Sequence, residues 1–403
     1  MWLINESFAR YWFSHFSSSF SHALTSFLIP FIGVSLLGAS AFEMGVLVAI
    51  QETPVILFSL PIGLWIDRID LRRALFLSLF AQSAVVGIMG GLLFGNWRSM
   101  ELLYATAALI GTVKLVNDLT GTTYIPALVA RQQLVGANSR LQISLALERV
   151  VGPVVGGAIA KLTPFLGFLF AAIGHFVAAI FIILVRVEKA PNSSTARLSW
   201  HDDIKSGLRL LFEIRMLRPV ILSSCIGSLA VGMFYALLIF ALIQSMRLDG
   251  ITAGLMVSVI GASTLVISLF VPRLTRIVGA GWAMIWGIGS SALGFACFAL
   301  GIIQLNISFT FVGLALVGVG TSLFSINQIS VRQAVTPPEY LGRVNASRRF
   351  VVFAFLPIGS LLGGVLAQMT SVAVSIGVAS AVMFASSLPL LVSPVKNYRL
   401  GGR

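Results

Sequence analysis

The stretch Gly63–Arg73, GLWIDRIDLRR, decides the fold class, because it places two aspartates and three arginines at the junction of two long apolar runs. We assign these runs to residues 43–65 and 73–95. Each is long enough to cross a bilayer as a helix, which takes about 20 apolar residues. A short charged segment between two such runs is typical of a loop at a membrane surface. The sequence therefore predicts an all-α integral membrane protein.

The composition of the whole chain supports this class. Of its 403 residues, 57% are hydrophobic and 10% are charged, against about 45–50% and about 25% in soluble domains. A soluble enzyme with so few polar residues could not cover its surface, and disordered chains are poor in apolar residues. The sequence also shows no nucleotide-binding P-loop, no metal-ligand spacing and no Ser-His-Asp set. We expect no enzyme activity, no cofactor and no bound metal ion.

Apolar runs separated by charged and Gly/Pro-rich segments predict twelve transmembrane helices. The 403 residues give about 34 for each helix with its loop, which leaves no room for a large soluble domain. The function must therefore reside among the helices. The predicted spans are 12–36, 43–65, 73–95, 101–126, 141–162, 165–187, 217–243, 251–273, 281–303, 307–331, 347–368 and 371–392.

The basic residues predict the orientation. With the N-terminus in the cytoplasm, 22 of the 27 Lys and Arg residues fall at cytoplasmic segments, whereas the outer loops hold only Arg98 and Arg247. Lys and Arg concentrate on the cytoplasmic side of membrane proteins. We therefore expect a multi-pass protein of a bacterial cell (inner) membrane with both termini inside. The net charge of +13 is then explained by basic residues that lie beside anionic lipid headgroups, and it does not indicate binding to nucleic acid.

The chain repeats itself at an offset of 207 residues. The repeat predicts two six-helix bundles, residues 1–187 and 217–403, joined by a cytoplasmic linker at 188–216 in which 201–216 has the pattern of an amphipathic helix. Parallel six-helix repeats are typical of transporters that bind a small molecule near the membrane midplane. We expect a monomer. The matched residues are Asn138, Gly152, Gly156, Gly157 and Ala160 with Asn345, Gly359, Gly363, Gly364 and Ala367.

GLWIDRIDLRR resembles the Gly-x-Leu-x-Asp-Arg-x-x-x-Arg-Arg signature of the major facilitator superfamily. The resemblance implies the twelve-helix major facilitator fold, with this motif as a cytoplasmic latch between the two halves. Its gating residues would be Gly63, Asp67, Arg68, Arg72 and Arg73. We expect Gly63 to allow a close helix approach. The alternative is a basic loop that only sets the topology.

A second motif lies in the span 141–162. Gly152, Pro153, Gly156 and Gly157 resemble the Gly-Pro-x-x-Gly-Gly motif of antiporters in this superfamily, which implies export by antiport. The alternative is helix packing through small residues, with a kink at the proline. The segments IPALVARQQLVGANSR and RQAVTPPEYLGRVNASRR resemble the enterobactin-exporter and macrolide-efflux branch. Siderophore importers share this architecture, so the direction of transport stays open.

Five ionisable residues inside the predicted spans are candidates for proton coupling. Charges at mid-bilayer are costly and normally face protein or water. Residues 114 and 118 are four apart, so they share a helix face and can pair. A structural ion pair is the alternative to coupling. The candidates are Glu52, Lys114, Asp118, Glu148 and Arg149, with Glu52 as the expected proton carrier.

Polar stripes on the first, fourth and tenth predicted spans indicate the walls of a substrate cavity. They recur at helical spacing, and the stripe on the first span lies beside an aromatic face. The alternative for each histidine of the first span is a satisfied residue in ordinary helix packing. The cavity candidates are His15, His22, Asn117, Thr321, Ser325 and Gln328.

The sequence thus predicts a secondary active transporter that exports a siderophore or a drug-like amphiphilic molecule in exchange for protons. A proton-coupled importer of a siderophore or another small solute is the first alternative. A membrane enzyme or scaffold that keeps the fold without transport is the second alternative. It would need a catalytic set of residues that the sequence does not contain.

Overall fold

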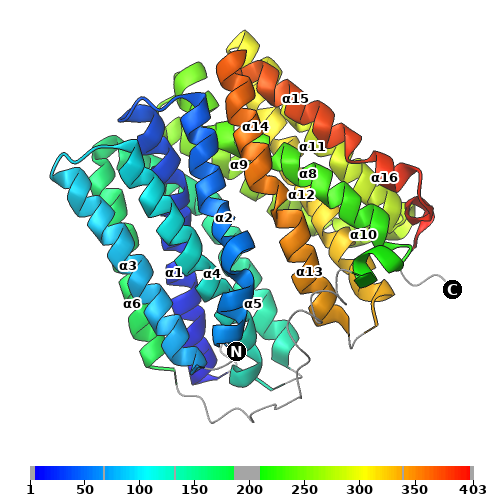
Figure 1. Ribbon diagram of the computed structural model, residues 1–403, viewed down its shortest axis with the longest axis horizontal. Coiled ribbons are helices and arrows are strands. Elements are labelled where there is room, and N and C mark those ends of the chain that lie inside the picture. The colour runs from blue at the N-terminus through cyan, green and yellow to red at the C-terminus, as the bar shows by residue number, and fades with distance from the viewer. Residues whose placement is uncertain (1–4, 67–68, 131–132, 186–208, 338–339, 400–403) are drawn as a thin grey trace. The chain divides into compact units, whose positions relative to one another are not determined.

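Nearly all described residues of the computed structural model are helical, as the long apolar runs predict (Figure 1). The linker prediction of an amphipathic helix at 201–216 lies partly outside these residues, and 209–213 are helical. The described residues are 5–66, 69–130, 133–185, 209–337 and 340–399.

The chain forms two compact units that exchange short segments. The first unit contains residues 1–39, 50–193 and 242–258, and the remaining residues form the second unit. Two helices therefore contribute to both units, namely α2 (Ala41–Ile66) and α9 (Gly250–Ser268). The predicted halves are contiguous in sequence, and their boundary at 188–216 stays a prediction.

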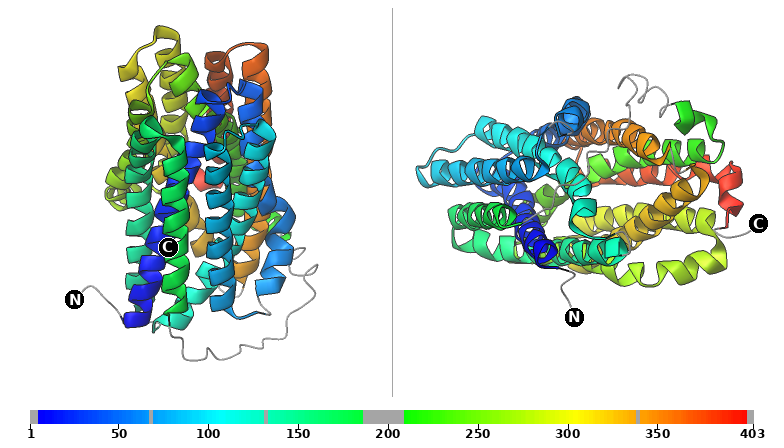
Figure 2. Two further views of the ribbon diagram at one scale, coloured as in Figure 1. Left: turned by 90° about the vertical axis from the view of Figure 1, so that its left-hand side faces the viewer. Right: turned by 90° about the horizontal axis from the view of Figure 1, so that it is seen from below.

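The first unit is built around its longest helix. α1 (Glu6–Ser35) packs against α5 (Leu134–Leu162) and α6 (Pro164–Ile183). α3 (Leu71–Phe94) packs against α6 and α4 (Met100–Leu128). Figure 2 shows the long helices of this unit running alongside one another. Such packing places residues from several helices at the same depth of the unit.

Three helix pairs make the main contacts of the second unit. α11 (Ala280–Gln304) packs against α12 (Ile307–Val335) and α15 (Val372–Ala385). α8 (Leu217–Phe240) packs against α14 (Phe355–Met369). The other described elements after residue 240 are a π-helix at Ala241–Ser245, α10 (Val271–Val278), α13 (Leu341–Phe353), α16 (Leu388–Leu391) and a 3-10 helix at Pro394–Asn397.

Eleven helical segments of the described chain are long and apolar enough to cross a membrane. They correspond to the last eleven predicted spans, which confirms the all-α, multi-pass membrane fold. α1 occupies the place of the first predicted span, 12–36. Its 30 residues are long enough to cross, but the serines and histidines along it lower its hydropathy. A membrane crossing by α1 stays a prediction.

Prolines interrupt three spans that the sequence predicts as single helices. α9, α13 and α15 end four residues before Pro272, Pro357 and Pro389. Proline has no N–H for the carbonyl four residues earlier, and its ring collides with that carbonyl. By contrast, α1 and α5 continue through Pro30 and Pro153.

Glycines of the repeat allow two helix pairs to approach closely. A Cβ on Gly157 of α5 would lie 2.0 Å from the carbonyl oxygen of Gly250, at the start of α9. At the matching place 207 residues later, a Cβ on Gly364 of α14 would lie 2.9 Å from the carbonyl oxygen of Ala41 in α2. Only a hydrogen atom fits at these positions. The sequence repeat therefore recurs as a repeat of close helix contacts.

Gly63 corrects one expectation. A Cβ on this residue would meet no described atom within 4 Å, so the close helix approach expected there is absent from the described residues. The reason is the exposure of this end of α2. Phe58 is 43% exposed and Trp65 is 44% exposed.

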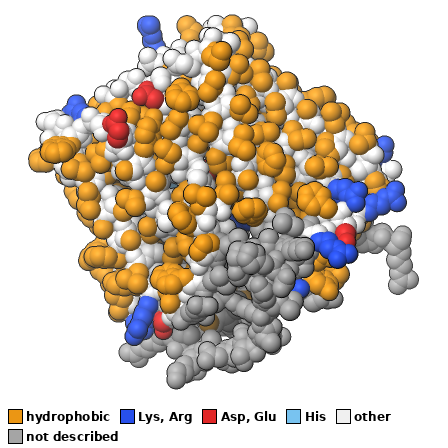
Figure 3. Space-filling view, viewed as in Figure 1, with side chains coloured by type: hydrophobic (Ala, Val, Ile, Leu, Met, Phe, Trp, Pro, Cys, Tyr) orange, Lys and Arg blue, Asp and Glu red, His pale blue; other side chains and the backbone are white. Residues whose placement is uncertain are grey.

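The outer surface suits a lipid environment. On the face shown in Figure 3, hydrophobic side chains cover most of the described area and charged side chains lie toward its margins. Leu57, Ile88 and Leu293 are 59%, 63% and 57% exposed. Soluble monomers rarely expose such extended apolar surface. Lipid chains can cover it.

Candidate functional site

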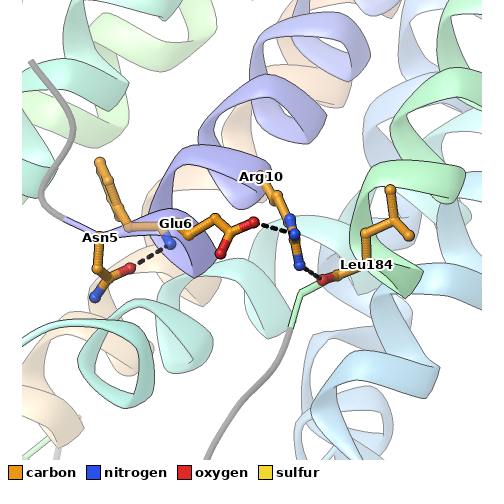
Figure 4. A network of polar contacts seen from close by, with 5 residues as sticks. Asn5, Glu6, Arg10 and Leu184 are labelled. Atoms are coloured by element: carbon orange, nitrogen blue, oxygen red, sulfur yellow. Dashed lines mark hydrogen bonds and ion pairs between the residues drawn. The ribbon is translucent and has the colours of Figure 1, made fainter.

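The start of α1 is anchored to its surroundings. Asn5 caps the helix, since its Oδ1 accepts a hydrogen bond of 2.6 Å from the backbone N–H of Phe8. Arg10 forms an ion pair with Glu6 and donates to the carbonyl of Leu184, directly after α6, at 2.6 Å (Figure 4). The contact with Leu184 joins the start of α1 to the end of α6.

Lys114 and Asp118 of α4 form an ion pair, with 2.6 Å between Nζ and Oδ2. The pairing predicted from their spacing is therefore present. Their side chains are 37% and 38% exposed, so the pair is not sealed in a packed core. A charged pair with access to its surroundings can meet a ligand or a proton.

Glu148 of α5 lies close to this pair. It interacts with the Ser19 hydroxyl of α1 and with the charges of Lys114 and Asp118. Its Oε2 is buried and has no hydrogen-bond partner among the described residues. Arg149 is exposed and acts on Glu148 through its charge. A buried carboxyl oxygen without a fixed partner can bind a proton.

Two histidines of α1 face the same charges. His15 interacts electrostatically with Asp118 and Lys114, and His22 interacts with Lys114. In the described part of the chain, the Nδ1 atoms of both histidines are buried without a hydrogen-bond partner. The three helices therefore bring together one group of ionisable side chains. We call His15, His22, Lys114, Asp118 and Glu148 the α1–α4–α5 cluster.

Sequence reasoning missed His175 of α6. This residue is 1% exposed, and its Nδ1 lies 3.5 Å from the Oγ of Ser18 in α1. Ser18 of α1 therefore packs toward α6. A signal was present in the sequence, because His175 is the only ionisable residue between Lys161 and Arg186.

Glu52 lies at a similar level on α2. The carbonyl oxygen of the preceding Gln51 lies 2.1 Å from a Cβ placed on Gly111, so α2 and α4 touch within one turn of Lys114. Glu52 is half-buried and makes an interaction of its own. Asn117 is half-buried on α4 between the two charged residues.

The predicted antiporter-like motif forms two packing surfaces of α5. A Cβ on Gly152 would lie 2.3 Å from the Cβ of Ala23, and a Cβ on Gly156 would lie 3.1 Å from Cδ1 of Phe27. Both neighbours belong to α1. Gly157 instead faces the start of α9, as described above. The motif, which also contains buried Pro153, thus positions α5 against two helices at once.

The predicted gating motif is described in part. Arg72 donates to the carbonyl of Ile183 at the end of α6. The backbone N–H of Arg73 donates to Oδ1 of Asp70 at 3.0 Å, which caps α3. Asp67 and Arg68 of this motif lie outside the described residues.

The residues of the predicted polar stripe of α12 differ in their exposure. Thr321 is exposed and Ser325 is half-buried. Gln328 is 2% exposed, its Oε1 accepts from Nη1 of Arg332 at 3.1 Å, and its Nε2 lies 3.5 Å from the Oγ of Ser224 in α8. The amide of Gln328 is thus used inside the second unit, and its predicted role in lining a cavity stays a prediction.

A multi-pass helical fold with an internal repeat and ionisable side chains within its spans defines a membrane transporter. The Major Facilitator Superfamily model matches residues 11–355. The chain belongs to the Major Facilitator Superfamily. It is therefore a transporter of a small molecule rather than an enzyme, which removes the alternative of a membrane enzyme or scaffold.

Individual relatives are distant. The enterobactin exporter EntS of Citrobacter koseri is 24% identical over 411 residues, which cover 99% of this chain and 96% of that protein. Multidrug resistance protein 1 of Bacillus subtilis is 26% identical over 275 residues, which cover 64% and 67%. The solved nucleoside transporter NupG has a TM-score of 0.78 at 14% identity and covers 96% of this chain and 99% of its own. At that identity the structural likeness shows the fold alone.

Proposed function

We propose that this chain is a proton-coupled exporter of a siderophore or a drug-like amphiphilic molecule in a bacterial inner membrane. One observation carries the proton coupling. The α1–α4–α5 cluster joins the ion pair of Lys114 and Asp118 to Glu148, whose Oε2 is buried without a partner among the described residues. The names of EntS and of Multidrug resistance protein 1 support export and this substrate class.

The cluster offers two carboxyl groups to one ammonium group. When both carboxyls are ionised, Glu148 competes with Asp118 for the charge of Lys114. A proton on Glu148 ends this competition and leaves Lys114 to Asp118. A substrate that changes the surroundings of the cluster can therefore change proton binding at Glu148. This proposal places the proton on Glu148 because its Oε2 is buried without a partner among the described residues. Glu52, the carrier expected from the sequence, is the alternative.

The test is the variant Glu148→Gln in proteoliposomes that contain purified protein and radiolabelled substrate. Glutamine keeps the size of the side chain but cannot carry the proton. We expect accumulation driven by a pH gradient to fall to background, while downhill counterflow continues. Glu6→Gln is the matched control, because Glu6 is 79% exposed at the start of α1. If Glu148→Gln still concentrates substrate against its gradient, Glu148 is not the proton carrier.

Direction and substrate need a second assay. Enterobactin and a lipophilic cationic dye would each be offered to vesicles with an imposed proton gradient of either sign. Export by antiport predicts that substrate moves against the proton flow. Movement with the proton flow would support the alternative of a proton-coupled importer. Transport of neither compound would remove both substrate classes from the proposal.

A further inference from the structure

The second unit contains three arginines that each have one buried donor without a partner among the described residues. Arg332 lies in the last turn of α12, and Arg348 and Arg349 lie in α13. The Nε atoms of all three are buried and have no hydrogen-bond partner among the described residues. Arg332 as a whole is 8% exposed. Buried cations in proteins are normally paired, so these donors point to a ligand.

Acidic residues for such pairing are scarce. Among residues 250–403, the sequence contains nine Lys and Arg residues and a single acidic residue, Glu339. None of the helices α8, α12, α13, α14 and α15 carries an aspartate or a glutamate. Glu339 lies outside the described residues. Glu213 lies between Leu211 and Ile214, which pack in one cluster with Val344 of α13, but it is paired with Arg209. An anion from outside the chain can therefore serve the three guanidinium groups.

The arginines belong to one site within the second unit. Arg348 interacts electrostatically with Arg332, Arg349 and the Cys225 side chain of α8. Gln328 links Arg332 to α8, since it accepts from Arg332 and contacts Ser224. Three helices of this unit thus meet around like charges, which repel one another unless an anion lies between them.

Two further buried hydroxyl groups lie on or next to the helices that carry these arginines. The Oγ of Ser223, next to Ser224 on α8, is buried without a partner in the described chain. The Oγ1 of Thr336, whose backbone N–H donates to the carbonyl of Arg332, is likewise buried and unpartnered. Ser223 is 1% exposed and Thr336 is 4% exposed. Hydroxyl groups and guanidinium groups together form the donor set that suits an oxyanion.

We propose that Arg332, Arg348 and Arg349 form a binding site for a phosphate group, with the hydroxyls of Ser223 and Thr336 as further donors. The planar guanidinium group matches phosphate oxygens with two parallel hydrogen bonds. The phosphate group comes either from the headgroup of an anionic lipid or from free phosphate. Basic pockets between transmembrane helices bind such headgroups. The position of Arg332 in the last helical turn suits that depth.

The experiment measures the apparent Tm of the purified full-length protein in neutral detergent. In one arm, inorganic phosphate replaces chloride at constant ionic strength. In the other arm, phosphatidylglycerol is added and compared with phosphatidylcholine. We expect at least one phosphate source to raise the Tm in a saturable way. We expect Arg332→Gln and Arg348→Gln to weaken the apparent affinity roughly tenfold or more, as loss of a charge-assisted hydrogen bond implies.

Arg273→Gln is the matched control, because Arg273 is exposed on α10 of the same unit. A response to inorganic phosphate identifies free phosphate as a ligand, and a response to phosphatidylglycerol alone identifies the lipid. The proposal fails if neither source stabilises the wild-type protein, or if Arg332→Gln and Arg348→Gln respond as the wild type does. If Arg332→Gln does not fold, the Tm responses of Arg348→Gln and Arg349→Gln are compared with that of the wild type instead. The α1–α4–α5 cluster lies in the first unit, so this test does not depend on the proposed proton coupling.

Discussion

At the residue scale, the contact between α5 and α9 depends on a side chain that is absent. Gly157 lies against the backbone of Gly250, and a Cβ there would be 2.0 Å from a carbonyl oxygen. A backbone atom cannot rotate away as the end of a flexible side chain can. The helices must therefore separate if residue 157 gains a methyl group.

We expect Gly157→Ala to destabilise the protein by about 1–3 kcal/mol, the usual cost of overpacking. The apparent Tm of the purified protein in mild detergent measures this effect. Gly289→Ala is the control, because a Cβ on Gly289 in α11 meets no described atom within 4 Å. Equal Tm values for the two variants would show that α9 yields to the methyl group without cost.

The candidate site was predictable where it depends on one helix. The spacing of Lys114 and Asp118 predicts their ion pair, since residues four apart share a helix face. Contacts between helices, such as Glu148 with Ser19 or Ser18 with His175, depend on rotation and register. The sequence contains no direct signal for these quantities. For the same reason, it did not separate the buried arginines of the second unit from an ordinary basic rim.

At the element scale, helix ends follow local chemistry. Asp249 precedes α9, and its Oδ1 accepts a hydrogen bond of 3.0 Å from the backbone N–H of Thr252. Hydrogen bonds from the side chain and backbone of Thr252 hold the pKa of Asp249 below its usual range. The ionised form therefore stabilises the start of α9. This cap lies directly before the glycine that contacts α5.

We expect Asp249→Ala to lower stability by about 1 kcal/mol near neutral pH, as loss of an N-cap does. The folded-state pKa is depressed, so the ionic part of this contribution is present above about pH 3.9, the ordinary pKa, and is lost as the pH falls through the lowered value. Apparent Tm values across a pH series measure the difference. Asp249→Asn keeps the acceptor and should retain most of the cap. Equal losses in both variants at neutral pH would contradict the role of this hydrogen bond.

Whether a helix ends before a proline could not be predicted from the local sequence. Apolar runs predict the positions of the spans, but Pro357 ends α13 whereas α5 continues through Pro153. A proline always lacks the N–H, yet the helix continues or breaks according to the packing around it. Since that packing comes from distant parts of the chain, the local sequence does not determine the outcome.

At the scale of the whole molecule, charge is distributed unevenly along the chain. Thirteen of the 14 acidic residues precede residue 250, while basic residues continue to the C-terminus. The outer loops of the predicted topology contain only two basic residues, Arg98 and Arg247. This asymmetry favours an orientation with both termini in the cytoplasm.

Single cysteines in a variant that lacks Cys225 and Cys297 test this topology. We expect Trp97→Cys and Arg247→Cys to react with an impermeant thiol reagent added to intact spheroplasts. Gln133→Cys and Asn397→Cys should react only after permeabilisation. All four positions are exposed, so burial does not explain a difference. The reverse labelling pattern would overturn the orientation.

α2 has a mechanical consequence for the transport cycle. Its residues through Ala49 belong to the second unit, and those from Ile50 belong to the first. Pro54, four residues further on, cannot donate to the carbonyl of Ile50, although the helix continues through it. α2 also contains Pro61, so it has two weakened places, and the first lies where the helix passes from one unit to the other. It can work as a flexure, a continuous rod with weakened sections, so that strain from either unit is taken up by bending at these sections while the rest of the rod stays stiff.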